Sequence, residues 1–125
     1  ANGFLTAKYG KESKFEKGTD YRSAMPQFTP EAIDKNQEMI GFIQEIAGKK
    51  QATPAQISLA WMLAKEPWIV PIPGTRKYDR LVENADAFEV ELTDQEVQEI
   101  DRILDTVPMS AVFGGSRVEE EKTGK

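Results

Sequence analysis

The most informative segment of the sequence runs from Ile72 to Asn84 and reads IPGTRKYDRLVEN. Its residue types predict the end of a strand, then a turn at a glycine, then the first turn of a helix. Free backbone N–H groups and the positive end of the dipole make a helix N-terminus suited to an anion. Arg76, Lys77 and Arg80 place cations in that turn, where a bare helix disfavours them. A bound phosphate group would relieve this conflict.

Gly74 and Thr75 fit the same interpretation. Gly74 lets a ligand approach the backbone closely. The Thr75 hydroxyl can cap the helix or donate to a phosphate oxygen. A plainer alternative stays open, because short glycine loops are common. In that alternative the glycine is an ordinary turn residue, the cations are solvated, and Glu83 and Asn84 are helix surface.

Two helices are predicted upstream of this stretch. Thr29 caps the first, which is expected to end near Gly48. Its apolar face is predicted to comprise Ile33, Met39, Ile40, Ile43, Ile46 and Ala47. The second helix opens with a capping box from Thr53 to Gln56 and ends at Pro67. Its body, residues 57–64, is apolar nearly all round, so we expect other elements to cover it on more than one side.

Residues 68–72 (WIVPI) form a short apolar run that predicts a strand. Pro71 counts against a central place in a sheet, because proline cannot donate to the ladder. One strand cannot form a sheet by itself. Either Phe4 and Leu5 supply a second strand, or the missing strands lie outside this chain.

Two more helices are predicted downstream. The third covers residues 77–87 and has apolar side chains at helical spacing, namely Tyr78, Leu81, Val82 and Ala85. The fourth opens with a capping box over residues 93–96 (TDQE) and is closed by Pro108. Residues 1–28 mix charges, glycines and aromatic rings without periodicity, which predicts a long surface loop. Residues 1–107 therefore read as one domain, with helices and the last strand over 29–107, and residues 108–125 as a flexible tail.

Composition excludes several classes of function. The chain has 125 residues, enough for one domain, and no cysteine or histidine. Disulfides, thiolate metal sites and Ser-His or Cys-His catalysis are therefore excluded within it, and the lack of cysteine fits a reducing cytoplasm. The net charge of −5 argues against nucleic acid as a partner. No apolar run approaches the roughly 20 residues of a membrane-spanning helix, and no secretory signal opens the sequence.

Four motifs, in order, resemble the aldo-keto reductase family. Residues 3–9 (GFLTAKY) are similar to the family's loop after the seventh barrel strand, and residues 53–61 (TPAQISLAW) to its seventh helix. Residues 72–84 are similar to the segment that holds the adenosine end of NADP, and residues 92–104 to the closing helix. The resemblance implies the C-terminal fragment of a (β/α)8 TIM barrel, α/β by family. As an isolated chain it would be mostly helical, with about four helices and one or two short strands.

The resemblance also implies a cofactor, NADP, and roles for named residues. Thr75, Arg76 and Arg80 would contact the 2'-phosphate, with backbone help from Gly74 and Lys77; Glu83 and Asn84 would meet the adenine edge; Gly3, Leu5 and Lys8 would lie along the pyrophosphate. The whole implied cofactor-binding set is Gly3, Leu5, Lys8, Pro73, Gly74, Thr75, Arg76, Lys77, Arg80, Glu83 and Asn84. The sequence departs from the family at two places along the pyrophosphate loop: Ala7 stands where the family usually has glycine, and Ala1-Asn2 where a Gly-Arg pair is common.

The family's catalytic tyrosine, lysine, aspartate and histidine belong to the first half of the barrel. Tyr9, Tyr21 and Tyr78 match none of these positions, so no catalytic residue and no metal ligand is assigned. The chain is predicted to bind NADP(H) without being active alone. A carbonyl substrate would bind only in the presence of the missing N-terminal half of the barrel. Exposed apolar helix faces are expected to favour self-association.

The sequence leaves two other classes of function open. The first is a small helical interaction or dimerisation module without enzymatic activity, which would not bind 2',5'-ADP. The second is a small enzyme that uses carboxylates such as Asp94, Glu96 and Glu99. These carboxylates follow the spacing of a helix cap and a solvated face, so the second alternative is weak.

Overall fold

The computed structural model describes residues 3–10 and 12–106, the side chain of Thr106 excepted. Its α-helices are α1 (Pro30–Lys35), α2 (Gln37–Lys50), α3 (Pro54–Lys65), α4 (Tyr78–Asp86) and α5 (Asp94–Thr106). Short 3-10 helices accompany them: η1 (Phe4–Thr6), η2 (Tyr21–Ala24), η3 (Pro26–Phe28) and η4 (Ala87–Glu89). Within the described residues no helix has the length and apolar character needed to cross a membrane.

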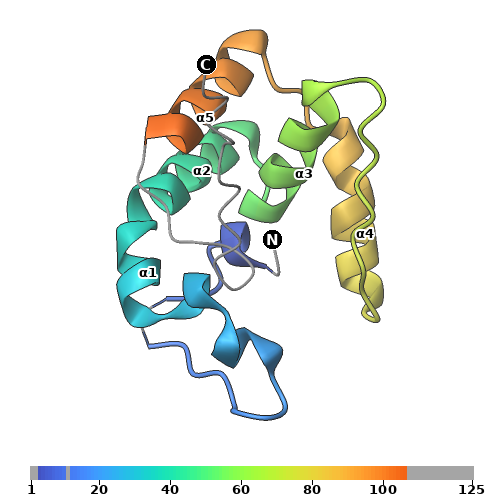
Figure 1. The fold of residues 1–125 in the computed structure, drawn as a ribbon. Helices are drawn as coiled ribbons and strands as arrows, with labels where there is room; N and C mark the ends of the chain where they lie inside the picture. Colours follow the sequence, from blue (N-terminus) through green and yellow to red (C-terminus); the bar gives the residue numbers. More distant parts are fainter. Residues whose placement is uncertain (1–2, 11, 107–125) are drawn as a thin grey trace, which may run out of the picture.

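Helix α3 is the centre of the fold (Figure 1). It contacts α2, α4, α5, η1 and η4. This arrangement confirms the expectation that a helix apolar nearly all round is covered on several sides. Ile57 is fully buried and Ala60 nearly so. The remaining elements are therefore placed by how they pack on α3.

The core lies between α2, α3 and α5. Its buried side chains are Met39, Ile43, Ile46, Ala47, Ile57, Ile100 and Ile103. Four of these belong to the apolar face predicted for the first helix, and the other two members of that face, Ile33 and Ile40, are buried as well. The prediction of that face is confirmed.

The bounds of the first helix were predicted incorrectly. The structure divides it at Asn36 into α1 and α2, and the Asn36 N–H donates to the carbonyls of Ala32 and Asp34. Gly48 does not end α2, which continues to Lys50. Gln51 ends it instead, with a left-handed φ of 53° and an N–H directed at the carbonyls of the last turn. A left-handed cap is more often glycine, which is why the sequence pointed to Gly48.

Both predicted capping boxes are confirmed. The Thr53 N–H donates to Gln56 Oε1 at 2.9 Å, and the Gln56 N–H donates to Thr53 Oγ1 at 3.2 Å. The Thr93 N–H donates to Glu96 Oε2 at 2.8 Å, with the reciprocal bond at 3.2 Å. These bonds satisfy N–H groups that a helix start would otherwise leave free. Pro108 and the predicted tail over 108–125 lie outside the described residues.

The predicted strand over residues 68–72 is wrong. Pro67 and Trp68 lie in a turn closed by the Ile69 N–H, which donates to the Glu66 carbonyl at 3.1 Å, and no β-strand occurs in residues 3–10 or 12–106. Phe4 and Leu5, the proposed second strand, lie in the 3-10 helix η1. Without a neighbouring strand, apolar side chains of the segment remain in solvent: Val70 is 76% exposed and Ile72 93%. A strand needs a partner about 4.8 Å away, and an apolar run cannot supply one by itself.

The third helix is confirmed as α4, but its apolar side faces solvent. Tyr78, Leu81 and Val82 are all exposed, while Glu83 and Asn84 on another side are half-buried. Residues 1–28 also differ from a plain surface loop, because η1, η2 and η3 fold there and Phe28 is buried. The aromatic rings of this segment gather in space rather than at a regular spacing, so periodicity gave no sign of them.

Candidate functional site

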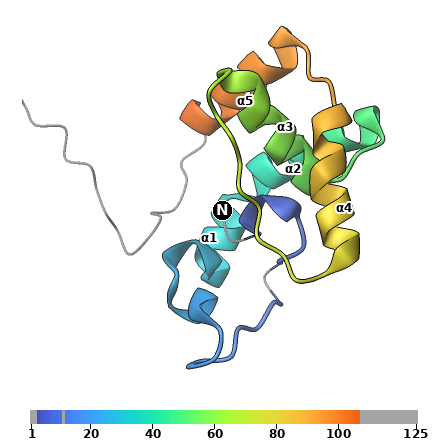
Figure 2. The ribbon, with the colours of Figure 1, turned by 90° about the vertical axis from the view of Figure 1, so that its right-hand side faces the viewer.

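A cavity of about 840 Å³ opens between η1, the segment 71–75, α3 and α4. Figure 2 shows the segment after α3 descending past η1 and turning into α4. Nine of the eleven residues predicted to bind the cofactor line this one cavity: Gly3, Leu5, Lys8, Pro73, Gly74, Thr75, Arg80, Glu83 and Asn84. The fold thus brings together two groups that lie some 65 residues apart in the sequence.

The structure does not bring Arg76 and Lys77 to the cavity wall. Both residues are exposed and neither lines the cavity. Lys77 is the N-cap residue of α4, so the helix itself begins at Tyr78, and no side chain bonds the helix N–H groups from the cap. The Thr75 hydroxyl accepts from the Lys77 N–H at 3.1 Å, which fixes the turn just ahead of the helix. The first-turn N–H groups of α4 are therefore left without a side-chain cap.

Gly74 leaves open space beside the backbone. A Cβ built on it would meet no atom within 4 Å, and its φ lies outside the left-handed region. The conformation itself does not require glycine here. What the missing side chain provides is access to the peptide groups of the turn from the cavity.

Arg80 and Glu83 form an ion pair at the edge of the cavity. Burial works to raise the pKa of Glu83, but hydrogen bonds from Arg80 and from the Thr53 side chain outweigh it and hold that pKa below its usual value. The same hydrogen bond to Glu83 raises the pKa of Arg80. Both groups are therefore charged at neutral pH, and the Arg80 guanidinium already has an anionic partner.

The capping box of α3 also holds α4 in place. Besides its bond to Thr53, Gln56 donates through Nε2 to the Glu83 carbonyl at 3.0 Å. This contact joins the start of α3 to the middle of α4, at the turn that carries Glu83 and Asn84. The separation between the two helices at the cavity is thus fixed by a hydrogen bond as well as by packing.

Ten lining residues were not predicted from the sequence: Thr6, Tyr9, Tyr21, Thr53, Ala55, Ser58, Leu59, Met62, Pro71 and Ile72. Five of them come from α3 or its cap. The signal that could have identified them is the all-round apolar character of that helix, since one of its sides must face something other than the core. The two tyrosines gave no such signal, because only the folded path of residues 8–21 brings them near.

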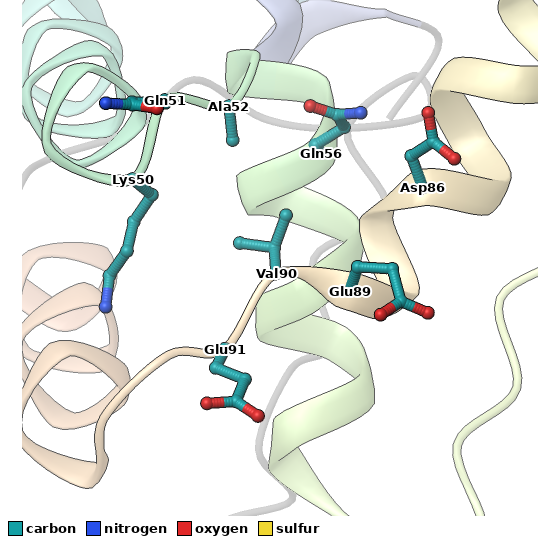
Figure 3. Close-up of a pocket in the computed structure, with 8 residues that line it drawn as sticks. All are labelled: Lys50, Gln51, Ala52, Gln56, Asp86, Glu89, Val90 and Glu91. Atoms are coloured by element: carbon teal, nitrogen blue, oxygen red, sulfur yellow. The ribbon is translucent and has the colours of Figure 1, made fainter.

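A second, smaller hollow of about 480 Å³ lies between the end of α2, the first turn of α3, and the end of α4 with η4 (Figure 3). It is lined by Lys50, Gln51, Ala52, Gln56, Asp86, Glu89, Val90 and Glu91. The lining contains three carboxylates and one lysine, and the Lys50 ammonium is paired with Glu96 at 2.8 Å. Such a lining repels a phosphate group, so this hollow is not a candidate for a nucleotide.

Glu96 and Glu99 form pairs typical of helix surfaces. Glu96 bonds the Thr93 N–H and Lys50, and Glu99 pairs with Arg102 at 2.5 Å. Neither lines either of the hollows described above. The carboxylate-enzyme alternative gains no support from these positions.

Comparison with known proteins gives a match over most of the chain. The model of the aldo/keto reductase family matches residues 1–105. Aldo-keto reductase yakc of Schizosaccharomyces pombe, whose name specifies NADP(+), is 42% identical over 103 residues. Aldo-keto reductase str7 of Strobilurus tenacellus is 35% identical over 103 residues, and probable aldo-keto reductase 1 of Glycine max is 42% identical over 92 residues.

These alignments cover much of this chain and a minor part of each relative. They include 82%, 82% and 74% of this chain, but only 30%, 30% and 26% of the respective relatives. The chain therefore spans about three tenths of the length of the curated relatives it matches.

Proposed function

The chain belongs to the aldo/keto reductase family, and on that premise we propose that it is the NADP-holding, C-terminal part of a carbonyl or alcohol oxidoreductase. In this proposal the chain receives the adenosine end and the diphosphate of the cofactor. The observation that carries the proposal is the single cavity that gathers Lys8 and Gly3 on one side with Thr75, Arg80 and Glu83 on the other.

The chemistry of the cavity wall fits such a ligand. Lys8 and Arg80 supply cationic donors, Thr75 a hydroxyl, and the start of α4 uncapped N–H groups. Guanidinium and helix N-terminus are both well suited to phosphate. Leu59 and Met62 of α3 offer apolar surface for a base or a ribose. A volume of about 840 Å³ also lies within the common range for small-molecule sites.

Each residue keeps one proposed task. Arg80 and Thr75 bind the 2'-phosphate, and Glu83 and Asn84 orient the adenine edge. Lys8 binds the diphosphate, and the open backbone at Gly74 lets the nucleotide approach the turn. Arg76 and Lys77 contribute through long-range attraction, because their side chains do not line the cavity and the Lys77 N–H already donates to Thr75 Oγ1. When bound, NADPH supplies the hydride for carbonyl reduction.

No residue of the chain is assigned to proton donation. The chain has no histidine, and its tyrosines match no catalytic position of the family. We therefore propose that the carbonyl substrate meets its catalytic groups outside this chain and that the chain alone turns over no substrate. Carbonyl reductase activity of the purified chain would contradict this part of the proposal.

Calorimetric titration with 2',5'-ADP tests the cofactor assignment, with 5'-AMP as the matched ligand that lacks the 2'-phosphate. We expect 2',5'-ADP to bind about 10- to 100-fold more tightly, the effect of one or two charge-assisted contacts. The difference should shrink as salt is added, because the cations are at least partly exposed. Equal affinity for the two nucleotides would refute the 2'-phosphate site.

An exposed apolar surface supports a second proposal, namely that the chain self-associates. Its members are Trp68, Val70, Ile72, Tyr78, Leu81, Val82 and Phe88, which we call the apolar surface. Residues of the segment 68–72 and of α4 contribute most of it. Large exposed apolar patches mark protein contacts, and these side chains come from segments that follow one another in the sequence.

Light scattering and a hydrophobic dye test self-association. We expect a mass above that of the monomer, decreasing on dilution, and dye binding that falls as the chains associate. Leu81→Lys should shift the population toward monomer, whereas the matched change Gln98→Lys on the exposed side of α5 should not. A monodisperse monomer that binds no dye would end this proposal.

A further inference from the structure

The turn that carries Gly3 and Lys8 is a strained piece of backbone. Gly3 and Ala7, at the two ends of η1, have φ values of 81° and 57°. Both lie in the left-handed region, which is unfavourable for alanine. Inside the turn, the Thr6 N–H and hydroxyl both donate to the Gly3 carbonyl, at 3.2 Å and 2.6 Å. A conformation of this kind persists when its surroundings hold it.

Leu5 and Tyr9 hold the turn from two sides. Leu5 packs against the core cluster. The ring of Tyr9 lies against Gly3, so closely that a Cβ on Gly3 would stand 3.1 Å from Tyr9 Cε2. Tyr9 also packs on Phe15 and on the buried Phe28, with ring centroids 5.4 Å and 5.7 Å away. Moving the ring of Tyr9 would therefore release one side of the turn.

Arg22 holds Tyr9 in place. Its guanidinium donates to the Tyr9 hydroxyl and lies 4.8 Å from the Tyr9 ring centroid and 5.1 Å from that of Phe15. Asp20 orients it, because Arg22 Nε donates to both Asp20 carboxylate oxygens, at 2.8 Å and 3.1 Å. Arg22 and Asp20 are about three-quarters buried, with 25% and 23% of their side chains exposed. A planar guanidinium can bond a carboxylate and stack on rings at the same time, which a lysine cannot.

We propose that Arg22 is a positioning residue for diphosphate binding, which acts through Tyr9 on the turn of residues 3–8. The inference rests on the proposed function, and it adds a residue that does not line the cavity. Lys8 and the backbone of the turn border the cavity only while Tyr9 presses on Gly3. The 2'-phosphate region includes Arg80 on α4, which the bond from Gln56 to the Glu83 carbonyl joins to α3, so we expect Arg22 to have little effect there.

Two ligands separate these regions. Adenosine 2'-monophosphate carries the 2'-phosphate and no diphosphate, whereas NADP+ carries both. Calorimetry on the full chain should give Arg22→Met an affinity for NADP+ about tenfold weaker than the unsubstituted chain, the effect of about one charge-assisted contact. Its affinity for adenosine 2'-monophosphate should stay within about twofold. Arg22→Lys should resemble Arg22→Met, since it keeps the charge but loses the planar contacts.

Tyr9→Phe covers the case in which Arg22→Met fails to fold. It keeps the ring packing and removes only the hydroxyl that Arg22 bonds, so we expect a smaller loss of NADP+ affinity in the same direction. Arg102→Met on α5 removes an arginine paired with Glu99 and is the charge control, with both affinities unchanged. The positioning role would be overturned if Arg22→Met weakened the affinity for both ligands equally, or changed neither affinity. If the unsubstituted chain does not bind adenosine 2'-monophosphate, the proposed function fails first and this inference with it.

Discussion

Replacing Glu83 by glutamine tests how the cavity selects a 2'-phosphate. In the structure Arg80 donates to the Glu83 carboxylate, so a phosphate that binds Arg80 competes with that carboxylate. Glu83→Gln keeps the size of the side chain and removes its charge. We therefore expect the variant to discriminate more strongly between 2',5'-ADP and 5'-AMP.

The exposure of the two side chains sets the size of this effect. The side chain of Arg80 is 52% exposed and that of Glu83 15%, which places the pair near the solvent boundary. Solvent screens a pair of that kind, so its contribution is small. Releasing Arg80 from it should therefore increase the affinity ratio of 2',5'-ADP to 5'-AMP by a factor of about 1.5 to 5. Arg80→Met removes the charge-assisted contact itself and should lower the ratio about tenfold or more.

The assay is a pair of titrations on each variant at two salt concentrations. Because both nucleotides contain adenine, the ratio of their affinities cancels any change in adenine binding that Glu83→Gln causes by itself. The double variant, which combines Glu83→Gln with Arg80→Met, should show the same affinity ratio as Arg80→Met alone. Glutamine at position 83 can strengthen phosphate binding only by releasing the Arg80 guanidinium.

Two results would refute this reasoning. If Glu83→Gln lowers the ratio, Glu83 does not compete with the phosphate but holds Arg80 in the binding orientation. If Arg80→Met leaves the ratio unchanged, Arg80 does not bind the 2'-phosphate, and the cavity loses its main cationic donor on the α4 side.

Three further predictions concern the stability of the fold. Ala7→Gly should stabilise the chain by about 0.5–1 kcal/mol and raise the Tm in a thermal melt, because the φ of 57° favours glycine; an unchanged or lower Tm would contradict the conformation of that turn. Ile57→Ala should cost about 2–5 kcal/mol in urea unfolding, because Ile57 is fully buried at the centre of the core; a loss below about 1 kcal/mol would mean that the site collapses or is not core. Hydrogen bonds from Lys65 and from Trp61 lower the pKa of Asp101 below the usual 3.8, so its stabilising effect is present above that pH and is lost as the pH falls further. Asp101→Asn should flatten the acid side of the stability profile, and an identical slope in both proteins would count against the role of this pair.

The features that were predicted correctly from the sequence depend on residues close to one another along the chain. The boxes at Thr53 and Thr93 depend on residues three positions apart, and both form. The apolar face of α2 and the all-round character of α3 likewise follow from spacing along a single helix. The strand over 68–72 depended on pairing with another segment, and none of the described residues provides that partner.

The cavity was predictable only in part, for the same reason. Residues 72–84 carry recognisable charges and a glycine turn, and the motif of residues 3–9 pointed to the same ligand. The α3 residues of the cavity wall have no polar pattern, and Arg22 reaches Tyr9 across 13 positions of an aperiodic segment. Contacts of that kind exist only once the chain has folded.

Most places where local preference and structure disagree lie near the cavity. Gln51, which lines the acidic hollow, is also left-handed, but it is the C-cap of α2, where that conformation is common. Ala7 is in a left-handed conformation beside Lys8, and α4 begins beside three cations without a side-chain cap. Helix α4 turns apolar side chains to solvent and its polar residues Glu83 and Asn84 toward the cavity. By contrast, α3 and α5, which pack in the core, both start with complete capping boxes and follow their apolar periodicity. Conflicts that remain in an otherwise consistent sequence concentrate at functional sites. Their position here favours the cavity over the acidic hollow as the functional site.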